Sequence, residues 1–395
     1  MILAPPGNPF LAPLVGSAHG TTQIDPSLEP CSWTSNMFTA VARRLALVLL
    51  LFLSLPVSLI AQGGCQGESR QFDFWIGEWD VLNRNRPAEE GRWYDTGTAT
   101  ARVYPVVAGC GLVEHWRGNA YGDFLVGFSL RAFNPQVGQW DLALLWPNSG
   151  EPRFGELGGG FRHGRGEFYS QGLTAEGDTT ITRFTFSDIT PNAIRWQDGF
   201  STDAGMLWNS GWIMEFTRRE PLYQGPLLNG PSVTTLRCPS PEYRGMDFLI
   251  GEWAGSVQAD SAEAEGMVVL SGVTPILEGC GVMERISAIG QTSAWEVFRV
   301  RAYETDRDKW VEYRLDTRWP ILQRLEADVP PAGAPWVFQT PGDQVMGGDL
   351  RVTMTRAVDG SVSWAEERYN AENSQWEASP LVAYTERLGA ASQGG

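Results

Sequence analysis

Apolar and polar residues alternate with a period of two along most of the chain after about residue 70. Within residues 126–132, Val, Phe, Leu and Ala occupy every second position, and residues 180–186 carry Thr and Phe in the same rhythm. Turn signals such as Asn134-Pro135 bound these segments. The pattern is typical of short, half-buried β-strands and predicts no helix in this part of the chain.

Two stretches of sequence recur at a nearly constant distance. Residues 72–79 reappear with few changes at 246–253, and residues 105–114 reappear at 275–284, at offsets of 174 and 170 residues. Small drifts of this kind correspond to a few deletions in loops. The repetition predicts two copies of one domain.

The copies span 70–219 and 245–388. Residues 220–244 between them are rich in Pro and Gly and are predicted to be a linker, and residues 389–395 a flexible tail. Antiparallel strands with one apolar face close most economically as an up-and-down barrel. We therefore predict an all-β protein with two tandem antiparallel β-barrels of about eight to ten strands each, with a two-sheet sandwich as the alternative. The interior of such a barrel has room for one small ligand.

The N-terminal residues are predicted to be a targeting segment rather than part of the fold. Two arginines precede an apolar run at 45–60, and small residues follow it. Because a membrane-spanning helix needs about 20 apolar residues, a signal peptide at 37–63 is favoured over a retained membrane anchor. Residues 1–36 would then be an upstream extension, with Met37 as the true start. The mature chain is expected to be exported, either periplasmic or secreted, without an integral membrane span.

Four cysteines remain after the predicted cleavage, and they correspond in pairs between the copies. This equivalence favours two disulfides, Cys65 to Cys110 and Cys238 to Cys280, among the three possible connectivities. The loop lengths give each bridge roughly 3 to 4 kcal/mol of stabilisation. A lipid anchor on Cys65 is less favoured, because Gln62 departs from the lipoprotein signal pattern and acylation would leave Cys110 unpaired.

The charge composition argues against some classes of binding partner. The chain has 46 acidic and 30 basic residues, a net charge of −16. This balance argues against nucleic acid and anionic membrane surfaces, which are bound mainly through Lys and Arg. The 17 tryptophans require cores or cavities that can hold large rings.

Three motifs of the first copy form a recognisable set: the Asp-Phe-Trp-Ile-Gly-Glu-Trp segment at 73–79, the Gly-Cys-Gly turn at 109–111 with Glu114, and the segment 201–208. Together they resemble the DUF1579 family of uncharacterised bacterial proteins. The Gly-x-Trp at the first strand also resembles the opening motif of the calycins, which include the lipocalins. The resemblance implies a calycin-like barrel and brings no established activity. It also implies that the glycine and tryptophan of this motif plug the closed end of each barrel: Gly77, Trp79, Gly251 and Trp253.

The resemblance extends to nitrobindin-type barrels, which bind haem through a histidine. The predicted mature chain has only His115 and His163, and Arg285 stands at the position of His115 in the second copy. A haem site is therefore not supported, and we predict no cofactor and no metal site.

Glu114 and its counterpart Glu284 are the most informative polar residues. Strand alternation puts Glu114 on the same face as Leu112 and Trp116, so both carboxylates are predicted to point inward among apolar neighbours. A buried carboxylate needs a partner, or its pKa rises. It is either a structural anchor or a pocket acid that grips a ligand or transfers a proton.

Arg131 and Arg301 are the obvious partners for these carboxylates. We assume that Phe128 faces inward, and strand parity then puts Arg131 on the opposite face, unless a bulge reverses it. Trp140 and Trp310 follow a turn and are expected to cover core rather than contact a ligand. The residues proposed to line the two interiors are Glu114, Trp116, Phe128, Trp140, Glu284, Phe298 and Trp310.

Three functions remain open from the sequence. The first is binding of a small, largely apolar or amphipathic molecule. The second is an isomerase, cyclase or hydrolase that uses Glu114 or Glu284 for proton transfer, and the third is an envelope interaction module with solid barrels. No serine-hydrolase, phosphate-loop or histidine-metal motif occurs in the mature chain. The aromatic residues near Glu114 favour the first copy as the functional one.

Overall fold

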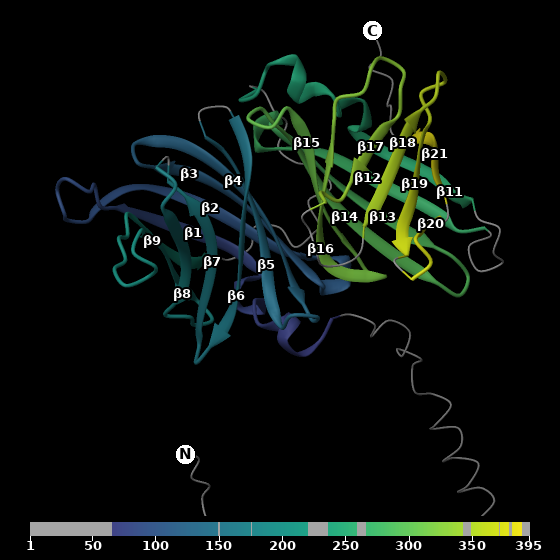
Figure 1. Cartoon of the computed structure of the whole chain (residues 1–395). Helices are drawn as coiled ribbons and strands as arrows, with labels where there is room; N and C mark the ends of the chain where they lie inside the picture. Colours follow the sequence, from purple (N-terminus) through teal and green to yellow (C-terminus); the bar gives the residue numbers. More distant parts are fainter. Residues whose placement is uncertain are drawn as a thin grey trace, which may run out of the picture. The chain divides into compact units, whose positions relative to one another are not determined.

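The computed structural model describes residues 65–148, 151–174, 176–219, 236–258, 266–342, 349–370, 372–378 and 381–388. The protein is all-β and contains two antiparallel β-barrels in tandem, one per sequence repeat (Figure 1). The predictions for 1–36, 37–63, 389–395 and most of the linker fall outside the described residues. In the described ranges, no helix combines the length and apolar character needed to cross a membrane.

Barrel 1 is an up-and-down barrel of ten strands. Each strand pairs with the next in sequence, and β1 closes the ring against β10. The strands are β1 (Gly77–Asn85), β2 (Tyr94–Val106), β3 (Gly111–Ala120), β4 (Asp123–Asn134), β5 (Gln139–Asn148), β6 (Glu151–Arg162), β7 (Arg165–Leu173), β8 (Thr179–Ser187), β9 (Ala193–Ser201) and β10 (Trp212–Arg219).

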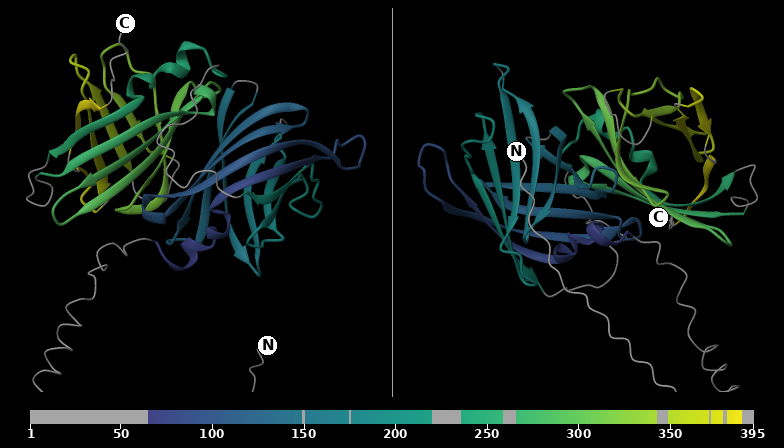
Figure 2. Two further views of the ribbon diagram at one scale, coloured as in Figure 1. Left: turned by 180° about the vertical axis from the view of Figure 1, so that it is seen from behind. Right: turned by 60° about the horizontal axis from the view of Figure 1, so that its bottom comes forward.

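Barrel 2 repeats this plan with one change at its C-terminal side. Ten of its strands form the ring, which closes where β18 pairs with β19, and β20 is attached to β19 as an additional strand. Figure 2 shows both barrels from two further sides. The strands are β11 (Gly251–Gln258), β12 (Val268–Ile276), β13 (Gly281–Ile289), β14 (Ala294–Glu304), β15 (Lys309–Asp316), β16 (Trp319–Ala327), β17 (Trp336–Gln339), β18 (Leu350–Arg356), β19 (Val362–Asn370), β20 (Gln375–Ala378) and β21 (Leu381–Leu388).

A short lead-in segment precedes each barrel. In barrel 1 it contains two 3-10 turns, η1 (Gly67–Arg70) and η2 (Asp73–Trp75), and the side chains of Phe72 and Trp75 are buried against the interior. In barrel 2 the equivalent turns are η4 (Pro241–Arg244) and η5 (Asp247–Leu249). The lead-ins close the end at which β1 and β11 begin.

The Gly-x-Trp motif lies at this closed end in both copies. The Trp79 indole donates to the carbonyl of Trp75 at 2.8 Å, and the Arg218 guanidinium covers its ring at 4.1 Å. Arg218 also donates to the carbonyls of Phe74 and Ile76. Gly77 has φ of 137°, and a Cβ there would collide with Arg218, so only glycine fits. Trp253 repeats the arrangement with Leu249 and Arg387.

Both predicted disulfides are confirmed. Cys65 is bonded to Cys110 and Cys238 to Cys280, and each bridge ties a lead-in to the turn before the third strand of its barrel. Residues 236–244, which the sequence assigns to the linker, include the bonded Cys238 and the turn η4. The lead-in of the second copy therefore begins inside that range.

Candidate functional site

The pairing of β3 with β4 fixes what faces the interior of barrel 1. Glu114 lies opposite Ser129, and Arg131 lies two residues further along β4 on the same face. The Glu114 Oε2 atom accepts hydrogen bonds from Ser129 Oγ and from Arg131 Nη2, both at 2.9 Å. All three side chains are buried. Glu114 is thus an inward carboxylate, and Arg131 is its partner.

Phe128 and Phe298 correct our expectation, because they face outward. Phe128 is the cross-strand neighbour of His115, and the two rings are in contact at 5.0 Å on the face opposite Glu114. Phe298 is likewise opposite Arg285. Phe128 and Arg131 do lie on opposite faces of β4, but the apolar face of this strand is the outer one. Arg131 therefore points inward without any bulge.

A cavity of about 890 Å³ occupies the interior of barrel 1. Four tryptophans form much of its apolar wall, and neighbouring rings contact one another with centroids 5.4 to 6.0 Å apart. The wall also includes side chains near the β3–β4 hairpin, at the end opposite the lead-in. The residues that carry the argument below are Glu114, Arg131, Trp75 and the four tryptophans Trp116, Trp146, Trp196 and Trp212.

Trp140 is absent from this wall. Its ring meets Phe72 edge to face at 4.8 Å, and its indole donates to Gln71 at 3.1 Å, so it packs against the lead-in at the closed end. This corrects its inclusion among the cavity residues and agrees with the core-covering role. Trp310 is also buried, with its ring against Tyr303 and Trp336.

The environment of Glu114 raises the pKa of its carboxyl. Burial raises the pKa of this carboxyl, and the opposing effects of Arg131 and Ser129 do not offset it. Burial also lowers the pKa of Arg131 to about 10. The guanidinium lies 3.8 Å from the Trp75 ring, with which it makes a cation–π contact.

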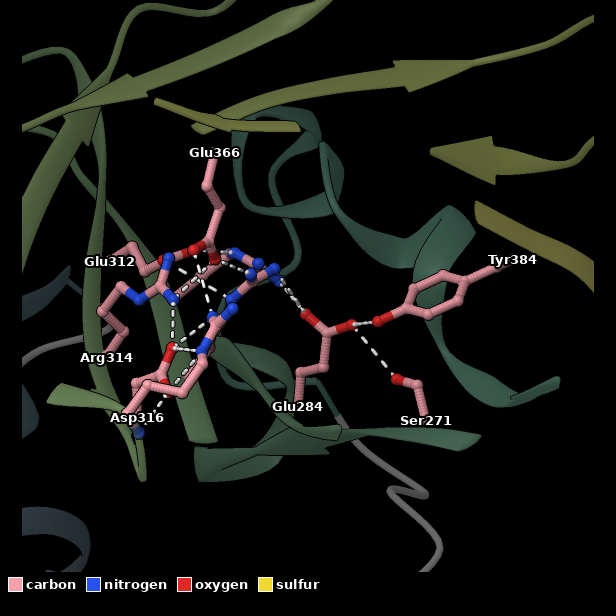
Figure 3. Close-up of polar contacts among 10 residues, drawn as sticks. Ser271, Glu284, Glu312, Arg314, Asp316, Glu366 and Tyr384 are labelled. Carbon is pink, nitrogen blue, oxygen red and sulfur yellow. Dashed lines mark hydrogen bonds and ion pairs between the residues drawn. The ribbon is translucent and has the colours of Figure 1, made fainter. Parts of the chain in front are cut away.

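Glu284 has much stronger polar support. It accepts hydrogen bonds from Arg301 at 2.8 Å, Tyr384 at 2.9 Å and Ser271 at 3.1 Å, and Arg299 lies 3.6 Å away (Figure 3). The two cationic neighbours outweigh burial and lower the pKa of Glu284. The two counterpart carboxylates therefore differ in the direction of their pKa shifts.

A network of charges extends from Glu284 across barrel 2 (Figure 3). Glu366 pairs with Arg314 at 2.6 Å, Arg318 at 3.2 Å and Arg299 at 3.3 Å. Arg314, Arg318 and Arg299 hold the pKa of Glu366 at about 2 despite its burial. The network contains four arginines and four acids, so its charges balance: Arg299, Arg301, Arg314, Arg318, Glu284, Glu312, Asp316 and Glu366.

In barrel 1, apolar residues occupy the positions that correspond to the charged residues of β15. At an offset of 170 residues, Leu142, Leu144 and Trp146 of β5 correspond to Glu312, Arg314 and Asp316 of β15. The strand pairings agree, since Leu144 lies opposite Ser129 and Arg314 lies opposite Arg299. The apolar cavity wall of one copy is thus replaced by paired charges in the other.

Sequence reasoning missed Trp146, Trp196 and Trp212 as cavity residues and the network as a whole. The alternation of Glu312, Arg314 and Asp316 in β15 was the available signal for the network. It resembles the polar face of an ordinary half-buried strand, and only the pairing of the acids with arginines from β14 reveals that this face is internal.

No family model matches the chain. No curated protein matches it either. Among solved structures, a protein of unknown function from the DUF3598 family of Nostoc punctiforme aligns at 13% identity with a TM-score of 0.24, covering 82% of this chain and all of that one. The S-type phycobiliprotein lyase of Guillardia theta aligns at 10% identity with a TM-score of 0.23, covering 40% of this chain and 99% of its own. At these scores the likeness carries no argument about function.

Proposed function

We propose that this protein is exported and that barrel 1 binds a small, largely apolar molecule. The cavity of about 890 Å³ is the observation that carries the proposal. Small-molecule sites are typically concave, largely apolar and of this volume, with a few polar groups that orient the ligand. Here the tryptophans supply the apolar wall, and Glu114 with Arg131 supplies the polar end.

In this proposal only barrel 1 binds the ligand, and barrel 2 has a structural role. The charged side chains of its interior are engaged with one another, and a largely apolar ligand would have to separate them. Separating buried ion pairs leaves uncompensated charges, which typically costs several kcal/mol. The third function considered from sequence, a module with solid barrels, is disfavoured for barrel 1 by its cavity.

Export and family membership are further parts of the proposal. The two disulfides are compatible with an oxidising compartment, and the segment 37–63 has the composition of a signal peptide. The bond between Cys65 and Cys110 argues against lipidation of Cys65. We also assign the chain, on its motifs, to the DUF1579-like calycin barrels.

A cavity-filling variant tests the binding function. Gly155 and Gly160 lie on the same strand, β6, and a Cβ at either position would meet no atom within 4 Å. Gly155 lines the cavity, whereas Gly160 does not. Mature protein should enhance the fluorescence of the neutral probe phenylnaphthylamine, and Gly155→Phe should abolish the enhancement while Gly160→Phe retains it.

Two results would count against the proposal. One is a wild-type protein that gives no probe fluorescence. The other is equal loss of the signal in both variants, which would locate the probe outside the cavity. Native mass spectrometry of the oxidised protein from an exporting host provides an independent readout, since a retained ligand adds mass that denaturation removes.

Proton transfer by Glu114 is the second candidate function. Its support is the raised pKa of a carboxyl that lines the cavity, which is the usual condition of a catalytic acid. Glu114→Gln separates the two functions. If the protein is an enzyme, this variant should lose turnover of the co-purified molecule but still bind it; if the protein is a binder, no turnover should occur in either form.

A further inference from the structure

The inner end of the barrel 1 cavity carries hydrogen-bond donors without acceptors. Arg131 uses Nη2 to bind Glu114, but its Nε and Nη1 atoms have no partner among the described residues. The side chain is only 3% exposed and lines the cavity. A buried guanidinium with two unused donor nitrogens thus lines the cavity.

Two indoles at the cavity wall share this condition. The Nε1 atoms of Trp75 and Trp116 are buried and likewise lack partners in the described part of the chain. Trp79 and Trp140, which lie outside the cavity, both have acceptors: the Trp75 carbonyl and the Gln71 side chain. Trp212 also lines the cavity, but its indole donates to Asn83 at 3.0 Å, and in barrel 2 the buried Trp310 Nε1 lacks a partner among the described residues. The unpaired indoles of the cavity wall that bear on the ligand are therefore those of Trp75 and Trp116.

Unpaired buried donors are unfavourable, since each costs about 1 to 3 kcal/mol unless a partner is supplied. The nearby acceptor, Glu114 Oε2, already takes two hydrogen bonds. A ligand that brought acceptor oxygens would satisfy the donors. The guanidinium makes its cation–π contact with Trp75, and its Nε and Nη1 atoms remain as donors that point to different sides of the group. A ligand carboxylate that accepted from either atom would form a charge-assisted hydrogen bond, which is stronger than a neutral one.

Resting on the binding function above, we propose that the ligand of barrel 1 is an aromatic carboxylate whose acid group binds Arg131. The aromatic part follows from the wall formed by Trp116, Trp146, Trp196 and Trp212, whose rings already meet one another edge to face or tilted. The acid part follows from the excess of donors over acceptors. Burial raises the pKa of Glu114, which makes protonation of this carboxyl less unfavourable when a second carboxylate approaches.

Three probes of similar size test the proposal on the wild-type protein by isothermal titration calorimetry. Naphthoate is aromatic and acidic, naphthalenemethanol is its neutral analogue, and octanoate is its aliphatic one. Naphthoate should bind about 10-fold or more tightly than naphthalenemethanol, as expected for a charge-assisted hydrogen bond, and more tightly than octanoate.

Variants assign the preference to particular atoms. Arg131→Met should abolish the preference for naphthoate while naphthalenemethanol still binds. Trp116→Phe keeps a ring but removes one unpaired N–H, so it should weaken naphthoate alone. Trp140→Phe, outside the cavity, is the matched control and should leave both affinities unchanged.

The outcomes separate this inference from the function on which it rests. Equal affinity for naphthoate and naphthalenemethanol would overturn the acid group, and octanoate binding as tightly as naphthoate would overturn the aromatic part. Binding of phenylnaphthylamine without binding of naphthoate would refute the inference and leave the proposed function standing. If no probe binds, both fail. The comparison of the three probes on the wild-type protein tests the inference even if Arg131→Met does not fold.

Discussion

Glu366 offers the sharpest test of the charge network in barrel 2. The proposed change is Glu366→Gln, which keeps the size of the side chain and removes its charge. Three arginines surround this carboxylate within 3.3 Å, and it is buried. The variant therefore leaves positive charges without their partner inside the barrel, and we expect marked destabilisation.

The size of the effect follows from the pKa of Glu366. Its arginine neighbours lower that pKa from 4.5 to about 2. Each unit corresponds to 1.36 kcal/mol, so the ionised form stabilises the fold by about 3 kcal/mol. Because the folded pKa is the lower one, this stabilisation is complete above the unfolded pKa and is lost as the pH falls from about 4.5 toward 2.

Glu367 provides a matched control one residue along the same strand, β19. It pairs with Arg351 at 2.7 Å, but about a third of each side chain is exposed. Exposed pairs contribute about 0 to 1 kcal/mol, so Glu367→Gln should have little effect. Urea unfolding at neutral pH should show a loss of about 3 kcal/mol for Glu366→Gln, and the gap to wild type should narrow at pH of about 3.

Two results would refute this reasoning. If the two variants are equally stable at neutral pH, the buried network contributes no more than a surface pair. If the loss of unfolding free energy in Glu366→Gln is the same at acidic pH, it results from packing and not from the ionised carboxylate.

Three other predictions concern the disulfide of barrel 1, the glycine at its closed end and the titration of His115. Replacing Cys65 and Cys110 together by Ala should lower the free energy of unfolding by about 4 kcal/mol in urea titrations, since the bridge closes a long loop; a loss below about 1 kcal/mol would contradict this. Gly77→Ala should cost about 1 to 3 kcal/mol because of its positive φ and the crowded space, whereas Gly160→Ala should be nearly neutral by thermal unfolding. Burial lowers the pKa of His115 to about 4, so its ring should stay neutral in NMR titrations down to about pH 5, and the stability it confers should decline as the pH falls from 6.5 toward 4.

The repeat, the barrel fold and both disulfides could be predicted from sequence, because each depends on spacing alone. The orientation of β4 could not. Phe128 and Leu130 on its outer face are as deeply buried as Ser129 and Arg131 on its inner face. Where both faces of a strand are buried, hydrophobicity no longer identifies the inner one, and here the polar residues mark the interior.

The network illustrates the same limit from the opposite direction. A charge at every second position ordinarily indicates contact with water. In β15 the charged face is internal, because Glu312 pairs with Arg301 of the neighbouring strand β14 and Arg314 pairs with Glu366 of β19, which is not a neighbour of β15 in the ring. Whether a charged face can point inward depends on opposite charges supplied by other strands, and the sequence of a single strand does not contain that information.

The disulfide-bonded lead-in of barrel 1 restricts the path by which a ligand could reach the proposed site. The disulfide holds the lead-in over one end, so a ligand of the proposed site would enter and leave on the side of the β3–β4 hairpin. Arg131 lies against Trp75 of the lead-in, at the far end of that path. A molecule bound to Arg131 would therefore enter with its polar group first, and that group would be the last part to leave. Its opposite end stays near the opening, so molecules that differ only in the length of that end can share one site.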